Sequence, residues 1–133
     1  PLTIVDGAHN PHGVRSLAKA LKSSFGAPKA VAVIGVLAGK NADEMLEVLA
    51  GSFEHVVLCA AKSDRALEVA ELQSLAIKYW GETKISVASS VAKAIQDARE
   101  LAANEKLEAI VITGSLTVVG EALTFVQEEN LED

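Results

Sequence analysis

Residues 2–11 read LTIVDGAHNP, and this stretch contains a complete strand-to-helix transition. Its first four residues are almost all apolar and rich in β-branched side chains, which is typical of a strand buried on both faces of a sheet. Asn10 can cap a helix, and Pro11 suits the first position of one. The stretch therefore predicts a β-strand that passes through a short loop into an α-helix.

The same strand-and-helix unit recurs along the chain. Runs rich in β-branched residues predict further strands at residues 30–34, 55–59, 109–113 and, more weakly, 84–87. Apolar residues at helical spacing predict amphipathic helices over residues 14–25, 45–49, 69–79, 91–101 and 119–126. This alternation predicts a three-layer, Rossmann-like α/β domain, with a mainly parallel sheet of about five strands and helices on both faces.

Two later helices carry start signals. Ser90 precedes the helix of residues 91–101 and is a suitable N-cap. Asn41, with Glu44 three residues further on, resembles a capping box. Both signals support the predicted helix boundaries, whereas the order of the strands in the sheet is left open by the sequence.

The composition limits the class of protein. The 133 residues are 50% apolar, carry a net charge of −6 and contain one cysteine, Cys59. This length suits a single domain, and the acidic balance argues against nucleic-acid binding. A lone cysteine fits a reducing compartment, and no apolar run is long enough for a membrane span. We therefore expect a cytoplasmic domain that binds neither nucleic acid nor membrane.

Residues that follow the strands are the candidates for chemistry, because ligands bind beyond the carboxyl ends of the strands in an open α/β sheet. Asp6 ends a buried strand, where a carboxylate is costly unless it is hydrogen-bonded or faces a ligand. His9 follows three residues later, and an imidazole is a side chain that can accept or donate a proton. The alternative is a well-capped turn without chemistry, but the two residues together at this edge favour a functional site.

Two glycine-containing loops could bind an anion. Lys40 precedes a predicted helix and could meet an anion there, or it could be a solvated lysine. That loop is not a Walker A motif, since only three residues separate Gly35 from Gly39. Gly114 and Ser115 open the last helix, where they could hold a carboxylate or phosphate or form a simple cap.

Other chemistry-bearing residues are less informative. Arg65 lies in the irregular stretch after the third strand and could reach the same edge, or it could be an ordinary surface arginine. Ser115 is not expected to be a nucleophile, because Thr113 and Thr117 occupy the glycine positions of the G-x-S-x-G elbow. Three scattered histidines and one cysteine do not make a metal site, so none is predicted.

The segment Asp6–Pro11 resembles the signature of the C-terminal domain of the Mur ligase superfamily, within it most closely the folylpolyglutamate synthase and dihydrofolate synthase family. Three further stretches agree in order and spacing: residues 35–41 resemble the family's Gly-Val-Leu-x-Asp-Lys-Asp loop, 64–67 its Pro-Arg-Ala segment and 113–121 its Gly-Ser-Leu-Tyr-x-x-Gly-Glu motif. The sequence departs from these patterns at Gly39, Asn41, Asp64 and Thr117. The departures leave the fold unaffected but put any role of the second and third loops in doubt.

The resemblance implies an enzyme that joins L-glutamate to a folate carboxylate at the expense of ATP. The folate carboxylate is first phosphorylated, and the amine of glutamate then attacks the acyl phosphate. In this family an N-terminal ATPase domain carries the P-loop and the magnesium ligands. The chain begins at Pro1, without Met and one residue before a strand. We therefore expect residues 1–133 to be a single C-terminal domain excised from such an enzyme, and to be inactive alone.

The family motifs also suggest residue roles. Asp6 and His9 match residues that contact ATP, and His9 and Ser115 match residues associated with glutamate. His9 is the catalytic candidate, because a neutral imidazole could accept a proton from the attacking ammonium, although positioning is the simpler role. Further site candidates, without assigned roles, are Asn10, Lys40, Arg65 and Gly114.

Three alternatives remain. A Mur ligase that acts on peptidoglycan precursors shares the first motif in looser form, although residues 114–121 favour the folate branch. A phosphoacceptor receiver domain has similar length and alternation, but lacks the required carboxylate after the third strand and the lysine after the fifth. A non-catalytic α/β module that binds a partner through its helices is the third.

Overall fold

The computed structural model describes residues 1–39 and 41–132, so Lys40 lies outside the described residues. Within that part of the chain, the strands are β1 (Leu2–Val5), β2 (Ala30–Ile34), β3 (His55–Leu58), β4 (Ile85–Val87) and β5 (Ala109–Thr113). The helices are α1 (Pro11–Ser23), α2 (Ala42–Ala50), α3 (Val69–Trp80), the short 3-10 helix η1 (Glu82–Lys84), α4 (Val91–Glu105) and α5 (Leu116–Glu132). The predicted alternation of strands and helices is confirmed.

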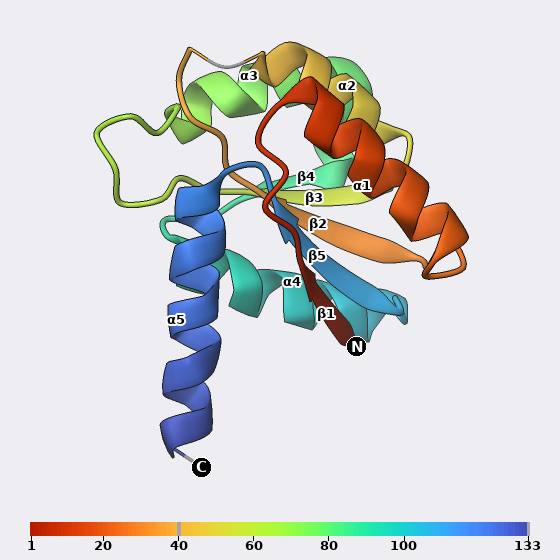
Figure 1. The fold of residues 1–133 in the computed structure, drawn as a ribbon, viewed down its shortest axis with the longest axis vertical. Helices are drawn as coiled ribbons and strands as arrows, with labels where there is room; N and C mark the ends of the chain where they lie inside the picture. Colours follow the sequence, from red (N-terminus) through yellow and green to blue (C-terminus); the bar gives the residue numbers. More distant parts are fainter. Residues whose placement is uncertain (40, 133) are drawn as a thin grey trace.

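The strands form one sheet in the order β1-β5-β2-β3-β4, and all four strand pairings are parallel. The last strand in sequence is thus inserted between the first two. Val5 lies opposite Ile112, and Ile34 lies opposite both Thr113 and Leu58. The carboxyl ends of β1, β5, β2 and β3 are therefore level, and the loops that follow these strands leave the sheet at one edge (Figure 1).

Helices cover both faces of the sheet (Figure 1). Helices α1, α2 and α3 pack on one face through the buried side chains Val14, Leu17, Leu21, Met45, Leu46, Leu49, Leu72 and Ala76. Helices α4 and α5 pack on the other through Val91, Ala94, Ile95, Ala98, Ala102, Val118 and Ala122. In β2, Ala32 and Ile34 face the first core, whereas Val31 and Val33 face the second. This two-sided burial explains why the central strands are apolar at every position.

The predicted caps are confirmed in two cases and wrong in one. Asn10 Oδ1 accepts a hydrogen bond from the Gly13 amide at 2.8 Å, and Ser90 Oγ accepts one from the Lys93 amide at 3.1 Å. Asn41 makes no side-chain cap bond, because its φ of −76° and ψ of 64° lie outside the extended conformation of the other two caps.

Several predicted boundaries also differ by a few residues. Helix α1 ends at Ser23, so Phe25 falls outside it and is 45% exposed instead of lying on the apolar face. Strand β3 ends at Leu58, although Cys59 is buried and its amide still donates to Ile34 O. Among the described residues, no helix is long and apolar enough to cross a membrane.

Candidate functional site at the carboxyl edge of the sheet

The loop after β1 is ordered by its own side chains. Asp6 Oδ1 accepts a hydrogen bond from the Ala8 amide at 2.8 Å, so this carboxylate oxygen closes an Asx turn. His9 Nδ1 lies 2.9 Å from Gly7 O. A carbonyl oxygen can only accept, so Nδ1 donates this hydrogen bond, and in the neutral form of an imidazole held in this way Nε2 would carry the lone pair. His9 is exposed and Asp6 is half-buried. The loop thus presents an oriented imidazole at the edge of the sheet.

The loop after β5 packs tightly against its neighbours. Gly114 has a φ of +113°, and a Cβ there would lie 2.4 Å from Gly35 O. Its amide donates to Ala8 O at 3.1 Å. Only glycine combines this φ with so close a backbone contact. The loops after β1, β2 and β5 therefore meet at Gly114.

Ser115 lies at the predicted edge, but its hydroxyl acts inside the domain. The residue is 1% exposed, and its Oγ accepts a hydrogen bond from the Val118 amide at 3.2 Å, which caps α5. The hydroxyl of Thr117 lies 3.1 Å from the same oxygen. The exposed polar side chain here is therefore that of Thr117, in the first turn of α5.

The loop after β3 crosses to the loop after β2. Leu37 and Ala66 form an isolated antiparallel bridge. On either side of it, the Ala38 amide donates to Arg65 O at 2.7 Å and the Leu67 amide donates to Val36 O at 2.9 Å. This bridge holds the backbone of Arg65 in place while its side chain is exposed.

A hollow of about 110 Å³ lies where these loops meet, lined by His9, Leu37, Arg65, Gly114, Leu116 and Thr117. It unites three predicted candidates: His9, Arg65 and Gly114. Asp6, Asn10 and Ser115 do not line it, and their side chains instead accept hydrogen bonds from backbone amides of the adjoining loop and helix starts. The other three lining residues, Leu37, Leu116 and Thr117, are not among the predicted site residues, although they lie within the predicted loops and family motifs.

The charges around the hollow favour an anion. Helices α1 and α5 begin at this edge, and neither has an acidic residue in its first turn. In contrast, α2 carries Asp43 and Glu44 in its first turn. The positive ends of α1 and α5 are thus not compensated by acidic residues of their own first turns, and the guanidinium of Arg65 adds a full positive charge. The carboxylate of Asp6 lies at the same edge but does not line the hollow.

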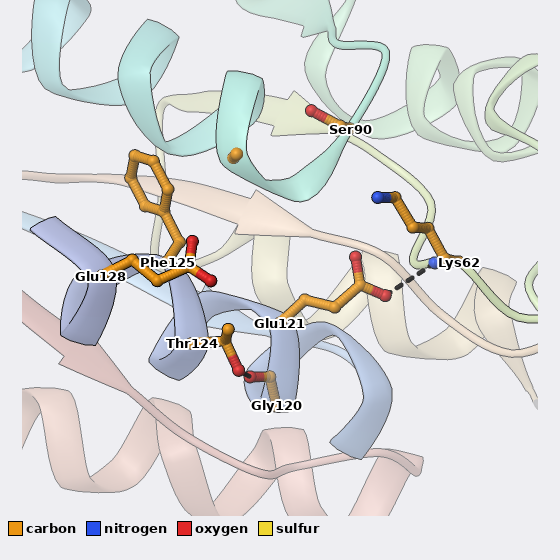
Figure 2. A pocket seen from close by; sticks show the side chains of 8 residues that line it. Lys62, Ser90, Gly120, Glu121, Thr124, Phe125 and Glu128 are labelled. Atoms are coloured by element: carbon orange, nitrogen blue, oxygen red, sulfur yellow. Dashed lines mark hydrogen bonds between the residues drawn. The ribbon is translucent and has the colours of Figure 1, made fainter.

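A larger hollow, of about 420 Å³, lies between α4 and α5 (Figure 2). Its wall includes Glu128 and Glu121, and Glu121 Oε2 accepts a hydrogen bond from the Lys62 amide at 2.6 Å. This bond ties α5 to the loop after β3, which is a structural role for the glutamate. None of the predicted site residues that the structure describes lines this hollow, so we assign the candidate site to the smaller hollow at the strand ends.

Acidic, histidine and cysteine side chains are too dispersed to form a metal centre in the described part of the chain. No group of three or more His, Cys, Asp or Glu side chains in residues 1–39 and 41–132 could hold a metal ion.

Fold and site together define a class: an α/β domain with a parallel sheet and a small hollow between the loops at its carboxyl edge. Residues 1–116 match the family described as "Mur ligase, glutamate ligase domain". The chain therefore belongs to the Mur ligase glutamate ligase domain family.

Two relatives of the chain have names that refer to folate enzymes. A dihydrofolate synthase/folylpolyglutamate synthase of Mycobacterium tuberculosis is 33% identical over 135 residues, which cover 93% of this chain and 28% of the relative. A folylpolyglutamate synthase of Lacticaseibacillus casei is 36% identical over 117 residues, which cover 87% of this chain and 25% of the relative. The chain thus spans about a quarter of the length of these relatives.

Solved structures agree with this result. The M. tuberculosis folylpolyglutamate synthase complexed with ADP superposes with a TM-score of 0.86 at 35% identity, covering 92% of this chain and 29% of that one. The Thermotoga maritima folylpolyglutamate synthase superposes with a TM-score of 0.74 at 36% identity, covering 94% and 27%. The predicted fold class and family resemblance are confirmed.

Proposed function

We propose that residues 1–133 form the C-terminal domain of an ATP-dependent ligase that adds L-glutamate to folates through an acyl phosphate. The observation that carries the proposal is the hollow at the sheet edge, where His9 and Arg65 meet the start of α5. The names of the relatives support folate over a peptidoglycan precursor as the acceptor. The remaining length of those relatives supports a longer parent enzyme with an N-terminal ATPase domain.

The chain would form one wall of a cleft between two domains. ATP would be bound mainly by the N-terminal domain, and Asp6 and His9 would contact it from this side. Magnesium would neutralise the phosphate charge, and no residue of this chain is assigned to it. The hollow of about 110 Å³ is far smaller than the roughly 300–1,000 Å³ of a complete small-molecule pocket. A small volume is expected of a half-site, because a second domain would complete the pocket.

His9 would act on the amine of glutamate. The amine attacks the acyl phosphate only after its ammonium form has lost a proton. Because Nδ1 donates to Gly7 O, the lone pair of Nε2 is available to orient the ammonium or to accept that proton. Glutamate would lie at the start of α5, and Ser115 would contribute mainly by capping this helix, since its Oγ already accepts from the Val118 amide.

The proposal includes a cytoplasmic location for the protein and an inactive isolated domain. A cytoplasmic location is supported by Cys59, the one cysteine of the sequence, which is buried as a free thiol. The isolated domain is expected to be inactive, because it would supply only one wall of the cleft.

The test uses the complete protein that contains this chain. Given ATP, a reduced folate and L-glutamate, it should release ADP and phosphate, and mass spectrometry should detect the folate extended by one glutamate. A UDP-linked muramoyl peptide precursor serves as the control acceptor. Amide formation with the control acceptor but not with the folate would contradict the proposal.

A further inference from the structure

The larger hollow, between α4 and α5, has the volume of a small-molecule pocket (Figure 2). Its volume of about 420 Å³ falls within the roughly 300–1,000 Å³ of such pockets, whereas the hollow of about 110 Å³ at the strand ends does not. Among the described residues, none lines both hollows. The larger hollow is therefore a candidate ligand site that is separate from the one at the sheet edge.

Phe125 forms an apolar wall of this hollow and is held in place by its neighbours. Its side chain packs against the second core, and the guanidinium carbon of Arg99 lies 5.6 Å from the centre of its ring. Arg99 is itself held by Glu129, whose two carboxylate oxygens accept its hydrogen bonds at 2.7 and 2.9 Å. A wall fixed in this way loses little conformational entropy when a ligand binds.

One end of the hollow carries a positive charge. The Lys62 amide donates to Glu121 at 2.6 Å, and the Lys62 ammonium points to the space between Ser90 and Glu121 (Figure 2). Within the described residues, no ion pair to this ammonium is found, whereas Lys78 and Lys93 each pair with an aspartate. Ser90 begins α4, which has no acidic residue in its first turn, so the positive end of this helix adds to the charge of the lysine.

The opposite end of the hollow carries a negative charge. Glu128 lies there beside Phe125 (Figure 2), and in residues 1–39 and 41–132 no ion pair to its carboxylate is found. Glu128 follows Glu121 by two turns of α5, which is roughly 10 Å along the helix axis at about 1.5 Å per residue. Glu121 is already bonded to the Lys62 amide. The two unpaired charges, of opposite sign, therefore stand at separate ends of one hollow.

We propose that the hollow between α4 and α5 binds a small zwitterion, with a carboxylate at one end of an apolar stem and an ammonium group at the other. The carboxylate pairs with Lys62, the ammonium group pairs with Glu128, and the stem lies against Ala92 and Phe125. The inference is independent of the proposed function, because it uses none of the residues assigned there.

The test measures the binding of ε-aminocaproate, a zwitterion of this kind, to the complete protein that contains this chain. A ligand-observed NMR titration gives the dissociation constant. Caproate and hexylamine each lack one of the two charges and should bind about two- to fivefold more weakly, as the loss of one exposed ion pair predicts. For the same reason, Lys62→Gln and Glu128→Gln should each raise the dissociation constant of ε-aminocaproate about two- to fivefold.

The matched controls are Lys93→Gln and Glu100→Gln, which remove exposed charges of α4 that do not line the hollow. Both should leave the dissociation constant unchanged, and so should Arg65→Gln at the smaller hollow. All five variants should keep the wild-type melting temperature, because the side chains they replace are exposed. Absence of binding, equal binding of the three probes, or unchanged binding in Lys62→Gln and Glu128→Gln would overturn the proposal. Equal weakening in Arg65→Gln and Lys62→Gln would also overturn it, since the zwitterion would then not be specific to the larger hollow.

Discussion

Gly114 is the single residue on which the packing of the site depends most. Its φ of +113°, and the 2.4 Å that would separate an added Cβ from Gly35 O, leave no room for a side chain. We predict that Gly114→Ala lowers the free energy of unfolding by about 2–4 kcal/mol, because it adds backbone strain and a steric clash. Urea denaturation measures this effect.

Gly120 provides the matched control for that substitution. It lies in α5, and an added Cβ would have no atom within 4 Å. Gly120→Ala should therefore raise stability by roughly 0.5–1 kcal/mol through helix propensity alone. If both variants lose the same stability, close packing of the loops at Gly114 is not the cause.

At the scale of the elements, α4 and α5 begin with equivalent serine caps. Ser90 Oγ and Ser115 Oγ accept from the third amide of their helices at 3.1 and 3.2 Å. Alanine at either position should lower the free energy of unfolding by about 1 kcal/mol. In the complete enzyme, only Ser115→Ala should raise the KM for L-glutamate, by about fivefold, because only α5 begins at the candidate site and its lost cap is worth about 1 kcal/mol.

Kinetic and stability measurements together distinguish a role of the loop around Ser115 in glutamate binding from a purely structural helix cap. Steady-state kinetics give the KM, and thermal or urea unfolding gives the stability. If Ser115→Ala matches Ser90→Ala in stability and also leaves the KM unchanged, then the loop after β5 is a capped turn without a role in glutamate binding.

At the scale of the whole molecule, the buried thiol of Cys59 links folding to pH. Burial, with a smaller contribution from the Glu121 charge, raises the pKa of Cys59 from 9.0 to about 12. Below about pH 9 the thiol is protonated in both states and contributes nothing. Between pH 9 and 12 only the unfolded chain ionises, so the free energy of unfolding should fall by up to about 1.4 kcal/mol per pH unit.

Cys59→Ala isolates this contribution from the lysines and tyrosine that titrate in the same range. Urea unfolding at about pH 8 and about pH 10 should show a steeper loss of stability in the wild type than in the variant. Parallel losses in the two proteins would mean that Cys59 ionises equally in the folded and unfolded chains.

Local sequence pattern was sufficient to predict the strands and helices and part of the candidate site. Apolar runs, helical spacing and the caps Asn10 and Ser90 are local features, and each lies where it was predicted. The placement of Asp6 and Ser115 at one edge also followed, because parallel strands end at the same edge of a sheet. Asn41 failed as a cap because its backbone conformation differs from that of a typical cap, which its side chain alone does not reveal.

The sequence by itself determined the fold class, the edge that carries the candidate site and the family motifs, since all three depend on short-range periodicity and residue order. The tertiary structure was needed for the insertion of β5 between β1 and β2, the burial of Ser115, and the meeting of Arg65 with His9 in one hollow. These features arise from contacts between residues that are tens of positions apart. Such contacts depend on how the strands are ordered in the sheet, and no local pattern encodes that order.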